Sequence, residues 1–249
     1  MTLSEIKKLS LRINKQHFLN SFIITVFLIV TTVVFSILPY IITSTKNYFD
    51  IKNGLILSAL CLVSFGYSII FSSYLVGKKA WYAGRMSKSK LGFKRMLFWF
   101  KLKYSFKAFR FKLILTFLKF VTVFILTFPS TLIINVTVIL AFSGGIEAII
   151  FISLLIGGIT LLLTGVMFAF TLNQRYFLAE YLYINNPRLS VIQTIKRSKN
   201  LLEGHIFEVV KFKLSFVPVF LTNILIIPIF FTVPYYKQSC CILAKELCI

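Results

Sequence analysis

Few side chains in this sequence could do chemistry, and they are widely spaced. The two histidines, His17 and His205, lie far apart, outside any H-E-x-x-H or H-x-x-x-H pattern. The seven Asp and Glu residues include no D-x-D pair that would suit Mg²⁺ or paired-carboxylate catalysis. An enzyme needs a nucleophile, an acid/base pair or a metal set. We therefore expect no catalytic residue, no metal site and no cofactor, and we expect that the protein is not an enzyme.

Glycine pairs and cysteines also lack the context that chemistry requires. The pairs at 144–145 and 157–158 are not followed by the Lys-Ser/Thr of a phosphate loop, so we expect tight turns or close helix approach. The cysteines show no C-x-x-C spacing and are expected to be small apolar side chains. They are Cys61, Cys240, Cys241 and Cys248.

Composition places the chain in a membrane. It is 58% apolar and only 14% charged, with a mean hydropathy of +0.87, whereas soluble domains are about 25% charged. The 28 Lys and Arg residues far outnumber the seven acids and lie mainly between the apolar runs. This arrangement favours attraction to the anionic cytoplasmic leaflet and argues against nucleic acid as the partner.

The apolar runs predict an all-α, polytopic transmembrane helical bundle. We expect a single integral membrane domain over residues 1–249, with six spans at about 18–42, 55–76, 113–141, 148–172, 211–227 and 228–247. Prolines 218, 228 and 234 interrupt the last two segments, which leaves one kinked fifth span as the alternative. Lys119 is the one charge within the third span, and we expect its side chain to snorkel towards the interface.

Orientation follows from the basic residues. The N-terminal arm and the segments 77–112 and 173–213 carry 23 of the 28 Lys and Arg residues. The positive-inside rule therefore predicts a multi-pass protein of the cytoplasmic membrane with its N-terminus in the cytoplasm. Six spans return the C-terminus to the cytoplasm, and five do not. In the N-terminal arm, Ile6, Leu9 and Ile13 predict a short amphipathic helix lying on the membrane.

The first basic segment predicts an amphipathic helix over 98–113. One face carries large apolar residues: Phe98, Leu102, Phe106, Phe109 and Leu113. The other face carries Lys103, Lys107 and Arg110. This face could bind anionic lipid headgroups or an acidic partner, and the alternative is a helix that only sets the topology.

The second basic segment predicts a helix with defined ends. Asn186-Pro187 ends the preceding helix, and Ser190 with Gln193 forms a capping-box pattern. Gly204 stands where a left-handed residue would end the new helix, at about 191–203. The exposed face of this helix would carry three cations, Lys196, Arg197 and Lys199. It could dock a partner, such as the ATPase of a transporter, or close the bundle from below.

This second segment resembles a bacterial family of membrane proteins known as domain of unknown function 975. The resemblance covers about residues 176–236 and rests on an Asn-Pro-x-Leu-Ser start, a basic centre and a Gly-His end. The matching residues are Asn186, Pro187, Leu189, Ser190, Ile195, Arg197, Ser198, Gly204 and His205, with 214–216 and 234–235 in the last membrane segment. The resemblance implies six spans with both ends inside, and it implies no known activity.

Two functional hypotheses follow. The first is a non-catalytic accessory or scaffold protein whose basic inner face binds anionic lipid or an acidic partner. The alternative is a transporter or permease subunit, suited to a lipophilic substrate because the spans are almost free of charge.

Overall fold

The computed structural model describes residues 1–43, 51–85, 92–144, 147–225 and 228–248, and these residues form helices, turns and bends without a strand. The all-α expectation is thus confirmed for the described part of the chain. The helices are α1 (Leu3–Gln16), α2 (Phe18–Thr43), α3 (Ile51–Gly84), α4 (Gly92–Phe98), α5 (Leu102–Phe142), α6 (Ala148–Asn173), η1 (Gln174–Tyr176), α7 (Ala179–Asn185), α8 (Val191–Leu201), α9 (Ile206–Leu214), α10 (Val217–Leu221), η2 (Thr222–Leu225) and α11 (Ile229–Glu246).

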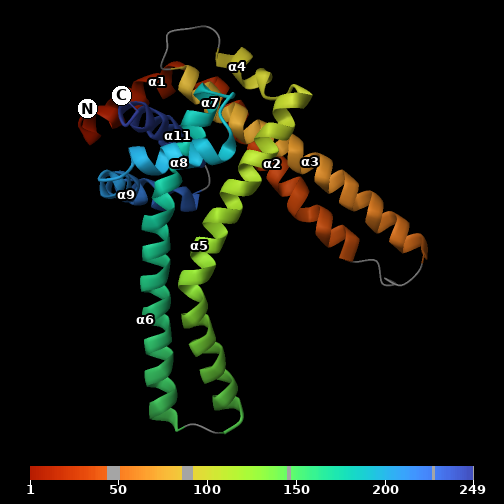
Figure 1. Cartoon of the computed structure of the whole chain (residues 1–249), viewed down its shortest axis with the longest axis vertical. Helices are drawn as coiled ribbons and strands as arrows, with labels where there is room; N and C mark the ends of the chain where they lie inside the picture. The colour runs from red at the N-terminus through yellow and green to blue at the C-terminus, as the bar shows by residue number, and fades with distance from the viewer. Residues whose placement is uncertain (44–50, 86–91, 145–146, 226–227, 249) are drawn as a thin grey trace.

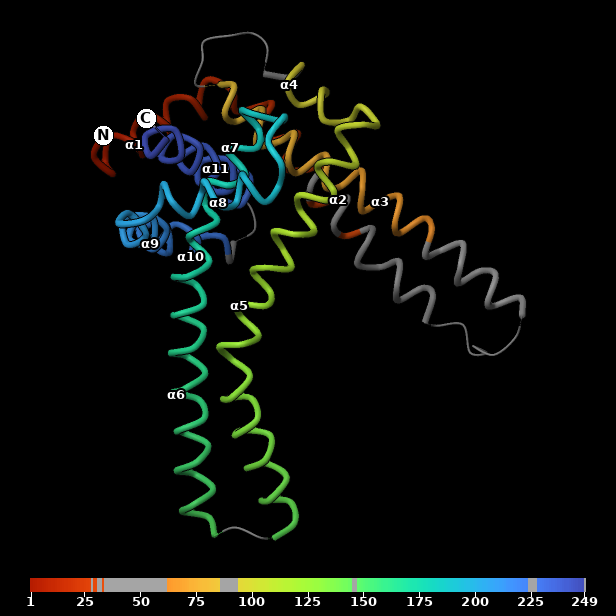
Figure 2. Tube along the Cα trace, in the orientation of Figure 1, coloured from red at the N-terminus to blue at the C-terminus, as the bar shows by residue number. Residues whose placement is uncertain are grey.

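Long helices extend from a compact group of shorter helices (Figure 1). Helices α1, α7, α8, α9 and α11 gather at one end, together with both chain termini, and are called the helical cap below (Figure 1). Helices α5 and α6 run side by side away from the cap as a hairpin (Figure 1). Figure 2 traces the same path and places α10 beside α9 at the cap.

Two helical segments are long and apolar enough to cross a membrane. They are Leu102–Phe142, which is α5, and Ala148–Asn185, which joins α6, η1 and α7. Their most apolar windows are only 11% and 6% buried, so they do not form the core of this fold. The expected spans 18–42 and 55–76 coincide with α2 and α3, but many of their side chains lie outside the described residues. Two of the six expected spans therefore meet this test.

Glycine brings α5 and α6 together. A Cβ atom at Gly158 would lie 2.7 Å from Cγ1 of Ile134, and one at Gly165 would lie 2.6 Å from the carbonyl oxygen of Leu126. Gly144 ends α5 with φ +69°, a conformation that glycine adopts without strain. Close helix approach at Gly158 and a tight turn at Gly144 are thus confirmed, whereas Gly145 lies outside the described residues.

The segment expected to form a fifth span is divided into short helices. Where the sequence predicts one run over 211–227, the structure has the end of α9, then α10 and η2. Pro218 lies at the start of α10, where its ring is compatible with a first helical turn but not with a continuing helix. Phe212 and Phe216 are fully buried in the cap, which keeps this segment there. The expected sixth span, 228–247, matches α11 in its bounds, and α11 also packs in the cap.

The N-terminal helix packs against the C-terminal helix rather than lying alone on a surface. Ile6 is 1% exposed in the core shared with α11, and the Ser10 and Ser239 hydroxyls are 2.6 Å apart. The terminal amino group of Met1 lies 3.3 Å from a carboxylate oxygen of Glu246. The two ends of the chain are therefore neighbours.

Candidate functional site: a lysine-lined cavity

Helix α7 carries a glutamate into the interior of the protein. Its neighbours Leu178, Ala179 and Leu182 are buried, so the helix is held between other elements. Asn186 leaves the helical conformation just before Pro187, as the sequence predicts, and α7 therefore stays short. The result is that Glu180 is only 8% exposed.

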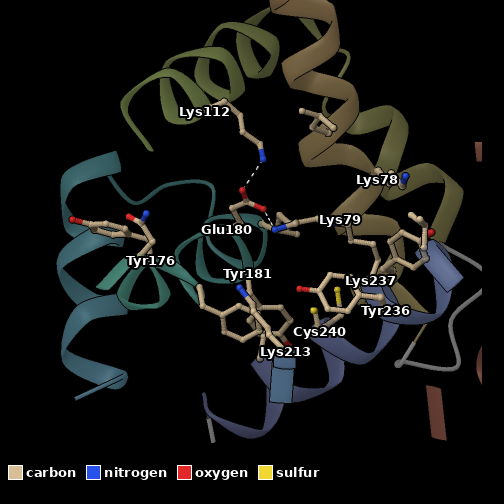
Figure 3. Close-up of a pocket in the computed structure, with 18 of the residues that line it drawn as sticks. Lys78, Lys79, Lys112, Tyr176, Glu180, Tyr181, Lys213, Tyr236, Lys237 and Cys240 are labelled. Carbon is tan, nitrogen blue, oxygen red and sulfur yellow. Dashed lines mark hydrogen bonds and ion pairs between the residues drawn. The ribbon is translucent and has the colours of Figure 1, made fainter. Parts of the chain in front are cut away.

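Glu180 faces a cavity of about 420 Å³ that is lined by residues of α3, α5, α7, α9 and α11 (Figure 3). Apolar atoms supply more of the lining surface than polar ones, from residues such as Leu75, Ile184 and Val233, and lysine and tyrosine side chains bring the polar groups. Six lysines line this cavity: Lys78, Lys79, Lys112, Lys119, Lys213 and Lys237. Glu180 is the one carboxylate in the described lining, so the cavity has an excess of positive charge.

Two of the lysines are paired with Glu180. The Lys112 ammonium donates to Oε1 of Glu180 at 2.6 Å, and Lys79 forms an ion pair with the other carboxylate oxygen. Figure 3 shows Glu180 between these two side chains. A single carboxylate on α7 therefore joins α3 to α5.

The other four lysines have no carboxylate within ion-pair distance among the described residues. Lys213 donates to the side-chain oxygen of Gln174, and its ammonium lies 5.0 Å from the ring centre of Phe177. Lys237 lies 5.6 Å from the ring centre of Tyr236. Four ammonium groups thus line one cavity without a carboxylate partner among the described residues.

This arrangement is suited to binding an anion. Lysine ammonium groups donate hydrogen bonds and accept none, so their natural ligands are carboxylates and phosphates. No group of three or more His, Cys, Asp or Glu side chains in the described residues is placed to hold a metal ion. Of the two histidines, His205 is exposed and lies 3.3 Å from Glu208 on the surface.

The family model described as Protein of unknown function (DUF975) matches residues 1–246. The chain belongs to this family. The resemblance seen in residues 176–236 is thus confirmed, and it extends over nearly the whole chain. Searches of curated proteins and of solved structures gave no match.

In this DUF975 protein the loop helix α8 begins at the predicted residue, Val191, and ends at Leu201, two residues before the predicted end. The Ser190 hydroxyl accepts from the backbone N–H of Gln193 at 3.2 Å, and the Gln193 side chain accepts from Ser190 N–H at 3.1 Å. Gly204 has φ +88°, although the regular helix already ends at Leu201. Thr194, Ile195 and Ser198 form the buried face of α8. Its three expected cations are exposed: Lys196, Arg197 and Lys199.

The expected basic helix over 98–113 differs from prediction in two ways. A turn separates α4, which ends at Phe98, from α5, which begins at Leu102. The predicted apolar face is also not the packed one, because Leu102 and Phe106 are 79% and 51% exposed. Burial falls instead on Ala108 and Phe111, which are small or flat enough to pack against α7 and α8. Lys103, Lys107 and Arg110 are exposed, as expected.

The cavity lysines of the DUF975 protein were not predicted as a site. One signal was available: Lys112 and Lys119 are seven residues apart, which places them on one face of a helix two turns apart. The sequence predicts that the Lys119 side chain snorkels towards the membrane interface, but in the structure Lys119 lines the cavity. The surface cations Lys103 and Lys196 are not part of this lining.

Proposed function

We propose that this DUF975 protein is a multi-pass protein of the cytoplasmic membrane that acts as a non-catalytic accessory protein and binds anionic lipid in the lysine-lined cavity. The observation that carries the proposal is the ratio of six lysines to one carboxylate around one cavity. Buried charges are costly unless they are paired, and an anionic ligand would pair them.

Exposure of the long apolar helices supports the membrane location. Helix α6, with 26 residues, is about 39 Å long, and a hydrocarbon core is about 30 Å thick. The contact between Met1 and Glu246 supports an even number of crossings, because it brings both termini to one side. Six spans satisfy this requirement, and so do four spans from α2, α3, α5 and α6; five do not. The basic cap then faces the cytoplasm.

The exposed cations have a second, less specific role in this proposal. Lys103, Lys107 and Arg110 on α5 attract the anionic leaflet by about 1 kcal/mol each, and salt screens this attraction. The cavity differs because its lysines line one partly open volume, and the proposal is that a single headgroup contacts several of them.

Retention of lipid by the purified full-length chain tests the proposal. Native mass spectrometry in mild detergent would compare phosphatidylglycerol with phosphatidylcholine of the same acyl chains. We expect several-fold more phosphatidylglycerol to be retained. Lys119→Gln combined with Lys237→Gln should remove this preference, whereas Lys211→Gln combined with Lys245→Gln, at exposed positions outside the lining, changes the charge equally and should preserve it. Equal retention of the two lipids, or loss of the preference only in the surface pair, would contradict the proposal.

A second candidate role is favoured by the exposed face of α8. Its three cations project from a helix whose opposite face is anchored in the cap, as a docking element for the ATPase of a transporter would require. In that case a nucleotide-binding subunit should co-purify in mild detergent and be lost in Arg197→Glu. Purification of the chain alone, together with an Arg197→Glu variant that behaves as wild type, would exclude this role.

A further inference from the structure

The cavity lining carries more hydrogen-bond donors than acceptors. Besides the lysines, the Tyr82 side chain lines the cavity, is fully buried, and its hydroxyl has no hydrogen-bond partner in the described part of the chain. Acceptors in the lining are fewer than donors: Glu180 is already engaged with Lys79 and Lys112, and the buried side-chain oxygen of Asn173 has no hydrogen-bond partner among the described residues. A complementary ligand must therefore be rich in acceptors, with a donor needed only at the Asn173 oxygen.

The formal charge of the cavity exceeds what one phosphodiester can neutralise. Six lysines against one glutamate leave a large positive excess. Four of the ammonium groups, one each from α3, α5, α9 and α11, have no carboxylate partner in the described residues. A phosphodiester carries one negative charge. A terminal phosphate carries about −1.5 to −2 at neutral pH and presents three strong acceptor oxygens.

The position of the cavity along α5 places it at the level of lipid headgroups. From Phe142, at the tip of the α5–α6 hairpin, to Lys119 the helix measures about 35 Å, which is slightly more than the hydrocarbon thickness. With the tip at the outer interface, Lys119 reaches the inner headgroup layer. Asn173, at the end of α6, lines the same cavity. This depth places the site at the level of the inner headgroup layer.

The size of the cavity agrees with a headgroup alone. Its volume of about 420 Å³ is at the low end of the range for small-molecule sites, about 300–1,000 Å³. The acyl or isoprenoid chains of a bound lipid would lie outside, against the exposed apolar faces of α5 and α6. Leu75 and Val233 provide an apolar part of the wall beside the charged groups.

We infer that the cavity selects lipids whose headgroup ends in a phosphomonoester or diphosphate over lipids with a singly charged phosphodiester. This inference rests on the proposed function, because it names the lipid class that the cavity would hold. The terminal phosphate lies among Lys78, Lys119 and Lys237 and receives a hydrogen bond from Tyr82, while Glu180 keeps Lys79 and Lys112 in place. The binding is reversible and involves no covalent step.

Competition between headgroups on the wild-type chain tests the inference. The full-length protein in mild detergent would be titrated with phosphatidic acid and with phosphatidylglycerol of identical acyl chains, and bound lipid would be read by native mass spectrometry. We expect half-saturation with phosphatidic acid at a concentration at least tenfold lower. Lys119→Gln combined with Lys237→Gln should reduce this ratio towards one, and the surface pair Lys211→Gln with Lys245→Gln, at exposed positions outside the lining, should leave it unchanged.

A competition experiment with a soluble anion distinguishes binding of a lipid from binding of a free anion. Inorganic pyrophosphate at the same concentration should not displace bound phosphatidic acid, because it lacks the apolar chains. Displacement at equal concentration would overturn the lipid assignment.

The lipid comparison has two outcomes that count against the inference. Equal affinity for phosphatidic acid and phosphatidylglycerol, with both lost in the Lys119→Gln, Lys237→Gln variant, would overturn the inference and leave the proposed function standing. Binding of neither lipid above phosphatidylcholine would overturn both. The headgroup comparison needs only wild-type protein, so it stands even where a lysine variant fails to fold.

Discussion

At the scale of single residues, Glu180 determines the charge balance of the cavity. It comes from α7, pairs with Lys79 on α3 and Lys112 on α5, and is the one acid in the described lining. Removing one partner of a buried ion pair leaves the other charge uncompensated, which costs more than the pair contributes. The same removal makes the cavity more positive. Stability and anion binding should therefore respond in opposite directions.

Glu180→Gln tests this opposition. The substitution preserves size and should lower the free energy of unfolding by about 3 kcal/mol, because two lysines lose their carboxylate. Retention of anionic lipid should rise at the same time. Thermal unfolding and native mass spectrometry in the same detergent measure the two effects. Glu203→Gln, at an exposed position, is the matched control and should change neither. A stable Glu180→Gln protein with unchanged lipid retention would contradict this account of the cavity.

Only part of this residue-level organisation could be predicted from the sequence. The spacing of Lys112 and Lys119 places them on one helix face, which is a local property. Lys79, Lys213 and Lys237 are distant in sequence and meet only because α3, α9 and α11 pack around α7. Periodicity within a helix carries no information about such packing. The exposed cations of α5 and α8 could be predicted, because the spacing of residues within one helix is enough to place them on its outer face.

At the scale of elements, the start of α8 and the positive φ of Gly204 were predictable because both are local, although the helix itself ends at Leu201. The Ser190 and Gln193 hydrogen bonds occur within one turn, and Gly204 needs its positive φ whatever surrounds it. The division of the expected fifth span into short helices was not predictable in this way. Its apolar sequence is compatible with a membrane span, but Phe212 and Phe216 are buried in the cap, and Pro218 begins a new helix there.

Loss of the N-terminal cap should loosen α8. Ser190→Ala removes the acceptor for the Gln193 N–H and should cost about 1 kcal/mol. Amide hydrogen exchange should accelerate over residues 191–201 and remain unchanged in α6. Ser190→Asp, which retains a capping oxygen, should behave as wild type. Equal protection of α8 in the alanine and aspartate variants would show that the cap does not hold this helix.

Helix α6 should tolerate a methyl group at one glycine and not at another. Gly165→Ala would place its Cβ against the Leu126 carbonyl, so the hairpin must separate, at a cost of about 1–3 kcal/mol. Gly157→Ala meets nothing within 4 Å and should be neutral or slightly stabilising, since alanine favours a helix. Thermal unfolding of both variants in detergent provides the comparison. Equal midpoints would mean that α5 and α6 are not closely packed there.

At the scale of the whole molecule, the cap and the hairpin must lie in different environments. The hairpin exposes large apolar side chains along its length, whereas the cap collects cations inside and outside. Bilayers separate such surfaces, and basic segments stay on the cytoplasmic side. In the proposed orientation the neighbouring termini lie on that side as well. The proposal also places the cavity at the boundary, at the level of the headgroups.

This arrangement predicts which positions a membrane-impermeant maleimide can reach in intact cells. Ser143→Cys, at the hairpin tip, should be labelled from outside. Arg95→Cys and Arg197→Cys, exposed on α4 and α8, should be labelled only after the cells are opened. The wild-type chain, with its native cysteines, gives the background. Labelling of residues 95 and 197 from opposite sides would contradict the placement of α4 and the helical cap on one side of the membrane. It would also remove the inner-leaflet access on which lipid binding at Lys119 depends.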